Sequence, residues 1–163
     1  MRNPKILRNT LLSLGVGLTA VLAPPTVDGQ VVAFNAQLNQ STLVSQSCNG
    51  GVCNSVFQGS GSVNIMGAVT WTANTVQDFN ITPCNTATAD ITFVGTTGSI
   101  TVSNSCGTVC PSATHNGFPA TIEAVWNATG GTGQFSGITG SGINQGTITP
   151  TGPVIHLNGV VVY

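Results

Sequence analysis

The chain has 163 residues, of which three are Lys or Arg and four are Asp or Glu, so only 4% are charged, against about a quarter in an ordinary soluble domain. All three basic residues, Arg2, Lys5 and Arg8, lie in the first eight positions. The remaining chain offers no cation to hold a phosphate. We therefore expect neither nucleic acid nor an anionic membrane surface as a partner.

The N-terminal segment is predicted to be a removable leader. Its basic start is followed by an uncharged apolar run over residues 11–23, which is shorter than the about 20 residues of a membrane span and typical of a secretory signal peptide. Small or modest side chains at residues 27–29 suit cleavage there. We expect residues 1–29 to be a Sec-type signal peptide and residues 30–163 to be one domain, secreted or periplasmic.

The rest of the chain alternates apolar and polar residues with period two, and no stretch keeps a helical period beyond a turn or two. This pattern predicts an all-β domain in which one face of each strand forms the core. In chain order, the predicted inward faces carry Val32, Phe34, Ala36 and Leu38; Val63, Ile65, Gly67, Val69 and Trp71; Ala89, Ile91 and Phe93; Ile100 and Val102; Ile122, Ala124 and Trp126; and Ile155, Leu157, Val161 and Tyr163.

Glycine-rich turn signals lie between the strands and suit a positive φ or a β-bulge. They are Asn49-Gly50-Gly51, Gly59-Ser60-Gly61, Thr96-Thr97-Gly98, Asn116-Gly117, Gly130-Gly131 and Gly140-Ser141-Gly142. Connections this short leave no room for helical crossovers, so the sheet is expected to be antiparallel. We predict a single closed β-barrel of about eight strands, with a β-sandwich as the alternative.

All five cysteines lie after the predicted leader, in a compartment where thiols pair. Turn residues between Cys48 and Cys53, and between Cys106 and Cys110, favour two local disulfides and leave Cys84 over. Other pairings stay open, because spacing alone does not settle connectivity. The cysteine gaps are loose for zinc, so we expect no metal and no other cofactor.

Two segments near the C-terminus carry a family resemblance. Residues 126–142, with the pattern GGTG-x-F-x-G-x-x-G, resemble the glycine-rich hairpin of the allene oxide cyclase and dirigent barrel superfamily, and residues 154–163 resemble its closing strand. The likeness is greater to an uncharacterised group of small secreted bacterial proteins with that barrel. It implies a barrel with Phe135 plugging one end. It does not imply the activity, because no catalytic glutamate matches and no arginine follows Arg8.

Few side chains are candidates for chemistry. Strand alternation turns Glu123, Asp78, Asp90 and His156 outward, and His115 falls in a loop. Glu123 is the single catalytic candidate, which would require that its carboxylate be buried. No serine nucleophile motif precedes a helix. The sequence thus leans away from an enzyme.

Three large inward residues, Trp71, Phe93 and Trp126, would line an apolar pocket if the barrel were hollow, or form a packed core if it were filled. Our first hypothesis is a secreted, non-enzymatic barrel with a structural or binding role. The second is a barrel that binds a small apolar ligand, or an isomerase or cyclase. A small outer-membrane barrel is the third. The partners considered are an apolar small molecule and a second copy of the chain.

Overall fold

The computed structural model describes residues 29–113 and 117–163, apart from the side chain of Gln40. The predicted leader, except for Gly29, lies outside the described residues, and so does His115. In the described part of the chain no helix is long and apolar enough to cross a membrane.

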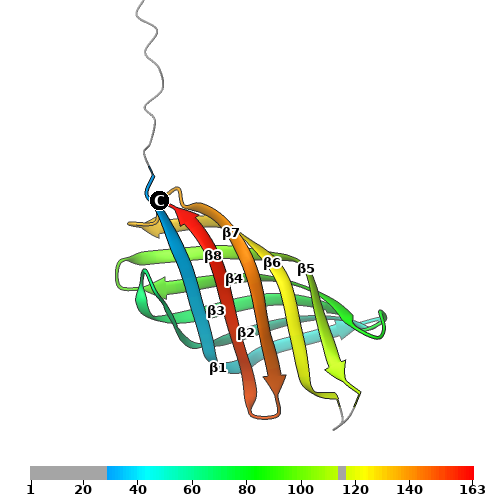
Figure 1. The fold of residues 1–163 in the computed structure, drawn as a ribbon. Coiled ribbons are helices and arrows are strands. Elements are labelled where there is room, and N and C mark those ends of the chain that lie inside the picture. The colour runs from blue at the N-terminus through cyan, green and yellow to red at the C-terminus, as the bar shows by residue number, and fades with distance from the viewer. Residues whose placement is uncertain (1–28, 114–116) are drawn as a thin grey trace, which may run out of the picture.

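Eight antiparallel strands follow one another around a closed barrel, in which β1 pairs with β2 on one side and with β8 on the other (Figure 1). The strands are β1 (Val31–Asn49), β2 (Val52–Val63), β3 (Gly67–Asp78), β4 (Asn85–Gly95), β5 (Gly98–Ser112), β6 (Gly117–Gly133), β7 (Thr139–Thr149) and β8 (Gly152–Val162). The predicted all-β barrel is confirmed. The sandwich alternative is wrong, because β1 and β8 join the sheet to itself.

The segment expected as one strand over residues 63–71 is a hairpin. β2 ends at Val63, which pairs with Gly67 at the start of β3, where φ is +79°. The side chain of Asn64 ties this turn to β1: its Nδ2 donates to the carbonyl oxygen of Ala33, and its Oδ1 accepts from the N–H of Asn35, both at 2.8 Å. The period-two pattern therefore breaks here.

Some of the segments predicted to be turns form turns in the structure, whereas others lie inside strands. The chain reverses after Asn49 and after Gly95, as expected. The glycines at 59–61, 130–131 and 140–142 instead lie inside β2, β6 and β7. Close packing explains part of this, because a Cβ on Gly142 or Gly159 would lie 2.7 or 2.6 Å from Cζ2 of Trp126. These glycines make room for an indole, as strand glycines do where another group approaches closely.

The packed core fills the end of the barrel that holds the C-terminus (Figure 1). The ring of Phe34 lies 5.0 Å from that of Trp126 and 6.2 Å from that of Phe93. Phe135, between β6 and β7, is fully buried and stacks edge-on against Tyr163 at 5.1 Å. The prediction that Phe135 plugs one end of the barrel is confirmed.

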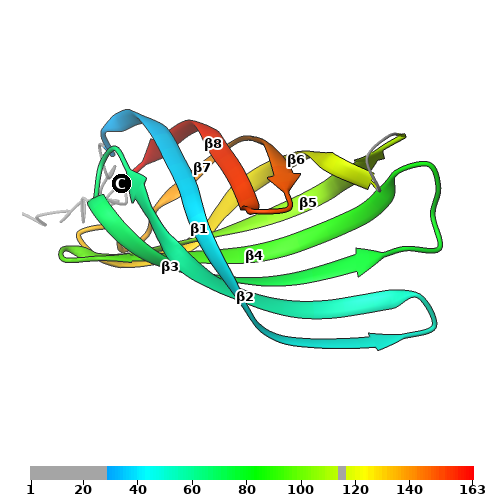
Figure 2. The ribbon, with the colours of Figure 1, turned by 90° about the horizontal axis from the view of Figure 1, so that it is seen from below.

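At the other end the strands separate. Pairing between β1 and β8 stops at Leu38 and Ile155, whereas β1 continues to Asn49 paired with β2 alone. Register shifts follow Leu38 and Leu43, and such bulges bend a strand. Figures 1 and 2 both show the β1–β2 hairpin reaching away from the β7–β8 turn. The barrel is therefore open at this end.

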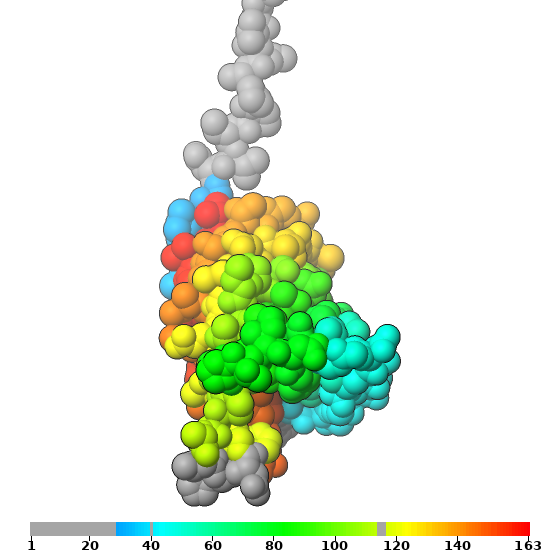
Figure 3. All heavy atoms as spheres, turned by 90° about the vertical axis from the view of Figure 1, so that its right-hand side faces the viewer, coloured from blue at the N-terminus to red at the C-terminus, as the bar shows by residue number. Residues whose placement is uncertain are grey.

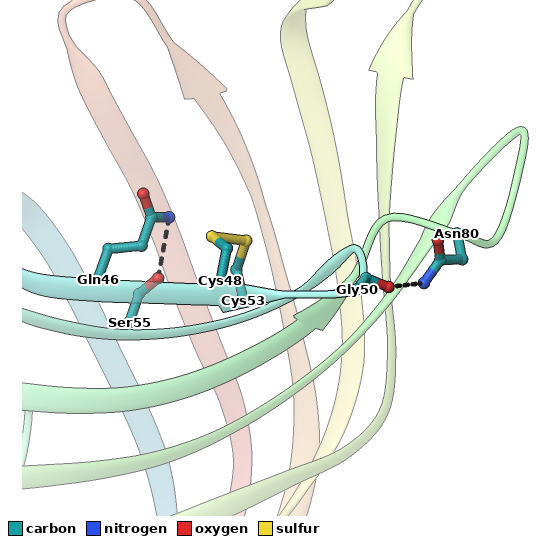
Figure 4. Close-up of a disulfide and its surroundings, with 6 residues drawn as sticks. All are labelled: Gln46, Cys48, Gly50, Cys53, Ser55 and Asn80. Atoms are coloured by element: carbon teal, nitrogen blue, oxygen red, sulfur yellow. Dashed lines mark hydrogen bonds between the residues drawn. A yellow bond between two sulfur atoms is a disulfide. The ribbon is translucent and has the colours of Figure 1, made fainter.

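The tip of the β1–β2 hairpin is attached to the loop after β3. The N–H of Phe79 donates to the carbonyl oxygen of Gly51 at 2.9 Å, and Nδ2 of Asn80 donates to that of Gly50 at 2.7 Å (Figure 4). Asp78 Oδ1 accepts the N–H of Asn80 at 2.9 Å. Figure 3 shows these cyan and green segments side by side. These bonds hold the hairpin where it has left β8.

One predicted disulfide is confirmed and the other is wrong. Cys48 bonds to Cys53 across the β1–β2 hairpin (Figure 4), but Cys110 bonds to Cys84, leaving Cys106 free and exposed. Cys106 and Cys110 lie on one strand, where four residues span about 13 Å, beyond the roughly 7 Å that a disulfide reaches between Cα atoms. Cys84 lies opposite Cys110, with the two Cα atoms 4.2 Å apart.

Candidate functional site

A cavity of about 190 Å³ occupies the lumen between the packed core and the open end. Every strand contributes to its wall, and most of the lining side chains are apolar. Leu38, Ile155 and Pro153 line it where β1 leaves β8. An apolar cavity of about 150 Å³ accommodates benzene, so this volume suits one substituted ring.

The cavity exists because the inward side chains become small towards the open end. Ala73, Ala87, Ala89 and Ala124 line it, whereas the closed end is filled by aromatic rings. Gly107 lines the cavity too, and a Cβ there would meet backbone of β4 and the side chain of Ala124. Native interiors are close-packed, so a hollow of this size in a small domain departs from ordinary core packing.

Only one of the three predicted ligand-binding residues lines the cavity. Trp71 is buried, borders the cavity, and donates its Nε1–H to the carbonyl oxygen of Ser60 at 3.0 Å. Phe93 and Trp126 belong to the packed core, where Trp126 donates its Nε1–H to the carbonyl oxygen of Ile143 at 3.1 Å. The packed and the hollow hypotheses therefore each apply to one part of the barrel.

Two asparagines in the cavity wall are the feature that sequence reasoning missed. Asn104 on β5 and Asn144 on β7 are 5% and 3% exposed, both line the cavity, and the Oδ1 of each has no hydrogen-bond partner among the described residues. A buried, unpaired acceptor costs about 1–3 kcal/mol. The sequence held a signal for Asn104, which continues the period-two series of the inward residues Ile100 and Val102.

No ionisable side chain of the described residues lines this cavity. Glu123 is exposed on the outer face of β6, between Thr108 of β5 and Gln145 of β7. Asp90 and His156 are exposed too, and Asp78 is the last residue of β3, where its carboxylate accepts the N–H of Asn80. Within residues 29–113 and 117–163, no group of three or more His, Cys, Asp or Glu could hold a metal ion.

A second, more polar hollow of about 600 Å³ crosses β1 to β5. Serine, threonine, asparagine and glutamine supply most of its lining, and it shares Thr75, Thr88, Ala89 and Asn104 with the apolar cavity. Ser55 in this hollow is buried, and its hydroxyl accepts from Nε2 of Gln46 at 3.1 Å (Figure 4). Asn104 thus stands where an apolar and a polar space adjoin.

Comparison with known proteins finds no matching family model, no similar curated protein and no similar solved structure. The resemblance of residues 126–142 and 154–163 to the allene oxide cyclase and dirigent superfamily stays a prediction.

Proposed function

We propose that this protein is a non-enzymatic binding protein that acts outside the cytoplasm and holds a small apolar molecule, about the size of one substituted ring, in its lumen. The observation that carries the proposal is the cavity of about 190 Å³ between the packed core and the open end. Ligand sites are usually preformed, mostly apolar concavities with a few polar groups, and this cavity has that composition.

The lining favours binding over acid–base catalysis. No carboxylate, imidazole or thiol is among the described residues that surround the cavity, and Glu123 points to the outer face. An isomerase or cyclase would need a proton donor or acceptor within hydrogen-bond reach of its substrate. The cyclase hypothesis therefore ranks below simple binding.

Action outside the cytoplasm is supported by two disulfides, because such bonds persist mainly in oxidising compartments. The predicted leader agrees with this. An outer-membrane barrel would carry apolar side chains on its outside. Here an outward row crossing five paired strands is polar: Asn74, Asp90, Ser103, Asn127 and Ser141. Exposed apolar side chains such as Val125, Ile143 and Val160 also lie on the outside, but the polar row interrupts them where a membrane barrel needs a continuous apolar band.

The test compares ligand binding to the unchanged protein with binding to a variant whose larger side chain fills the cavity. We expect 4-ethyltoluene to bind the purified barrel saturably in calorimetry and to raise its unfolding temperature, as any ligand of the folded state does. Ala124→Leu, which projects into the cavity, should abolish both effects. Val125→Leu is the matched control, since Val125 is the next residue and is 47% exposed.

Glu123→Gln should bind 4-ethyltoluene like the unchanged protein, because its carboxylate lies outside the cavity. Failure of the unchanged protein to bind any single-ring compound would contradict the proposal and leave a structural role. Binding that survives Ala124→Leu would place the ligand elsewhere.

A further inference from the structure

We infer that β1 carries an interaction surface for a second copy of this chain. The surface is the backbone edge of residues 39–49, which we call the free edge, and it pairs antiparallel with the free edge of the copy. Pairing with β8 stops at Leu38, whereas β1 continues to Asn49 paired with β2 alone. Figure 2 shows this cyan part of β1 at the lower margin of the sheet. The inference does not depend on the proposed ligand.

The hairpin geometry identifies the backbone groups that the free edge presents. Asn49 and Val52 flank a two-residue turn whose glycines both have positive φ, so the turn is of type I′ and the flanking residues exchange both hydrogen bonds. Such pairs alternate along antiparallel strands. Ser47 therefore also bonds to β2, whereas Gln46 and Cys48 direct their N–H and C=O groups away from it. These outward groups form a template for another extended strand.

The free edge lacks most of the features that keep native edges from pairing. Residues 42–49 are exposed without interruption, whereas exposed and less exposed residues alternate in the first half of β1. Residues 39–49 include no charged residue, histidine, proline or glycine. Native edges are guarded by charges, prolines, bulges or short length, and here only the bulges after Leu38 and Leu43 are present. An identical edge can therefore approach without charge repulsion.

The sequence of the free edge favours a second copy over an unrelated peptide. Its only large apolar side chains, Leu43 and Val44, are 47% and 55% exposed. They lie in the middle of the stretch, with mainly Ser, Thr, Asn and Gln on both sides. Turned about a two-fold axis, such a stretch is its own antiparallel complement, because the apolar middles meet and the polar ends form the rim. The contact covers the free edge of both copies, so assembly should stop at the dimer.

The free edge is held in position before a partner binds. The disulfide between Cys48 and Cys53 joins β1 to β2 near the tip (Figure 4). The carbonyl oxygens of Gly50 and Gly51 accept hydrogen bonds from the loop after β3. A surface that is already ordered avoids the entropy cost of ordering it on binding.

The test measures the mass of the folded protein by sedimentation across a range of concentrations. Every sample carries Cys106→Ser, so that the exposed free thiol cannot link two copies. We expect the mass to rise from that of one chain to twice that value and no further. Gln46→Pro removes an outward N–H that β2 does not use, and proline is tolerated at such an edge position. This variant should keep the mass of one chain at every concentration.

Gln46→Ala is the matched control. It loses the same side chain, including the bond from Nε2 to the hydroxyl of Ser55 at 3.1 Å, but it keeps the backbone N–H and should still form the dimer. Hydrogen exchange gives a readout that needs no edge variant and stands even if the proline variant fails to fold. The amides of Gln46 and Cys48 should exchange more slowly in the dimer than after dilution, whereas that of Ser47, already bonded to β2, should change less.

The outcomes separate this inference from the proposed function. The mass of one chain at every concentration overturns the inference, and so do assemblies larger than two chains. A dimer that survives in folded Gln46→Pro, or that Gln46→Ala disrupts, also overturns it, because the contact would then not be the backbone edge. None of these results changes the expected binding of 4-ethyltoluene, which tests the lumen alone.

Discussion

Two inward tryptophans have different surroundings. The indole of Trp126 is fully buried, lies 5.0 Å from the ring of Phe34 and is flanked by Gly142 and Gly159. The indole of Trp71 is buried against the wall but borders the cavity. The same residue type therefore fills the core at one position and lines a binding space at the other.

This difference predicts unequal stability losses. Trp126→Ala should lower the free energy of unfolding by about 3–5 kcal/mol, as truncation of a packed aromatic residue does. Trp71→Ala should cost less, because part of its ring already lacks packing partners and so makes fewer dispersion contacts. Urea unfolding of both variants measures the difference. Equal losses would indicate that the lumen is filled around Trp71 too.

At the scale of elements, the open end depends on cross-links where strand pairing is incomplete. Cys48–Cys53 joins the two strands of the β1–β2 hairpin beyond the point where β1 leaves β8. Cys84–Cys110 fixes the residue before β4 against β5. The large buried side chains are concentrated at the closed end, so the two bonds stabilise the part of the barrel with the least core.

The two disulfides should contribute unequally. The chain-entropy relation gives about 2 kcal/mol for closing the loop between Cys48 and Cys53, five residues apart, and about 3.5 kcal/mol for that between Cys84 and Cys110, 26 residues apart. Replacing each pair with serine and measuring urea unfolding tests this order.

Alkylation provides an independent check of the pairing. In the native, unreduced protein only Cys106, which is exposed, should react with iodoacetamide. Labelling of Cys84 instead would contradict the pairing described here.

At the scale of the whole molecule, the barrel is packed at one end and hollow at the other, and it is built from a chain almost without charge. Outside the first eight residues there is no Lys or Arg, so the outward row on β3 to β7 owes its polarity to hydroxyl and amide groups and to the single carboxylate of Asp90.

This composition gives a prediction for the secreted form. If the leader is removed, trypsin should leave the protein intact even after denaturation and reduction, because no cleavage site remains. Mass spectrometry of the digest checks this, with chymotrypsin as the control that must cut the unfolded chain. A purified protein that still contains Lys5 would contradict the leader assignment.

The sequence by itself determined the features that are local. Period-two alternation predicted an all-β barrel with its apolar faces inward, because side-chain alternation and turn chemistry act over a few residues. The burial of Phe135 at one end was expected from the resemblance of residues 126–142 alone. Only the tertiary structure decided the features that depend on register between strands. Cys84 faces Cys110 because β4 and β5 align those positions. Likewise, Asn104 and Asn144 share one cavity because barrel closure brings β5 and β7 around the same lumen. Register is set by bulges and by contacts between residues far apart in the chain, and no single segment encodes it.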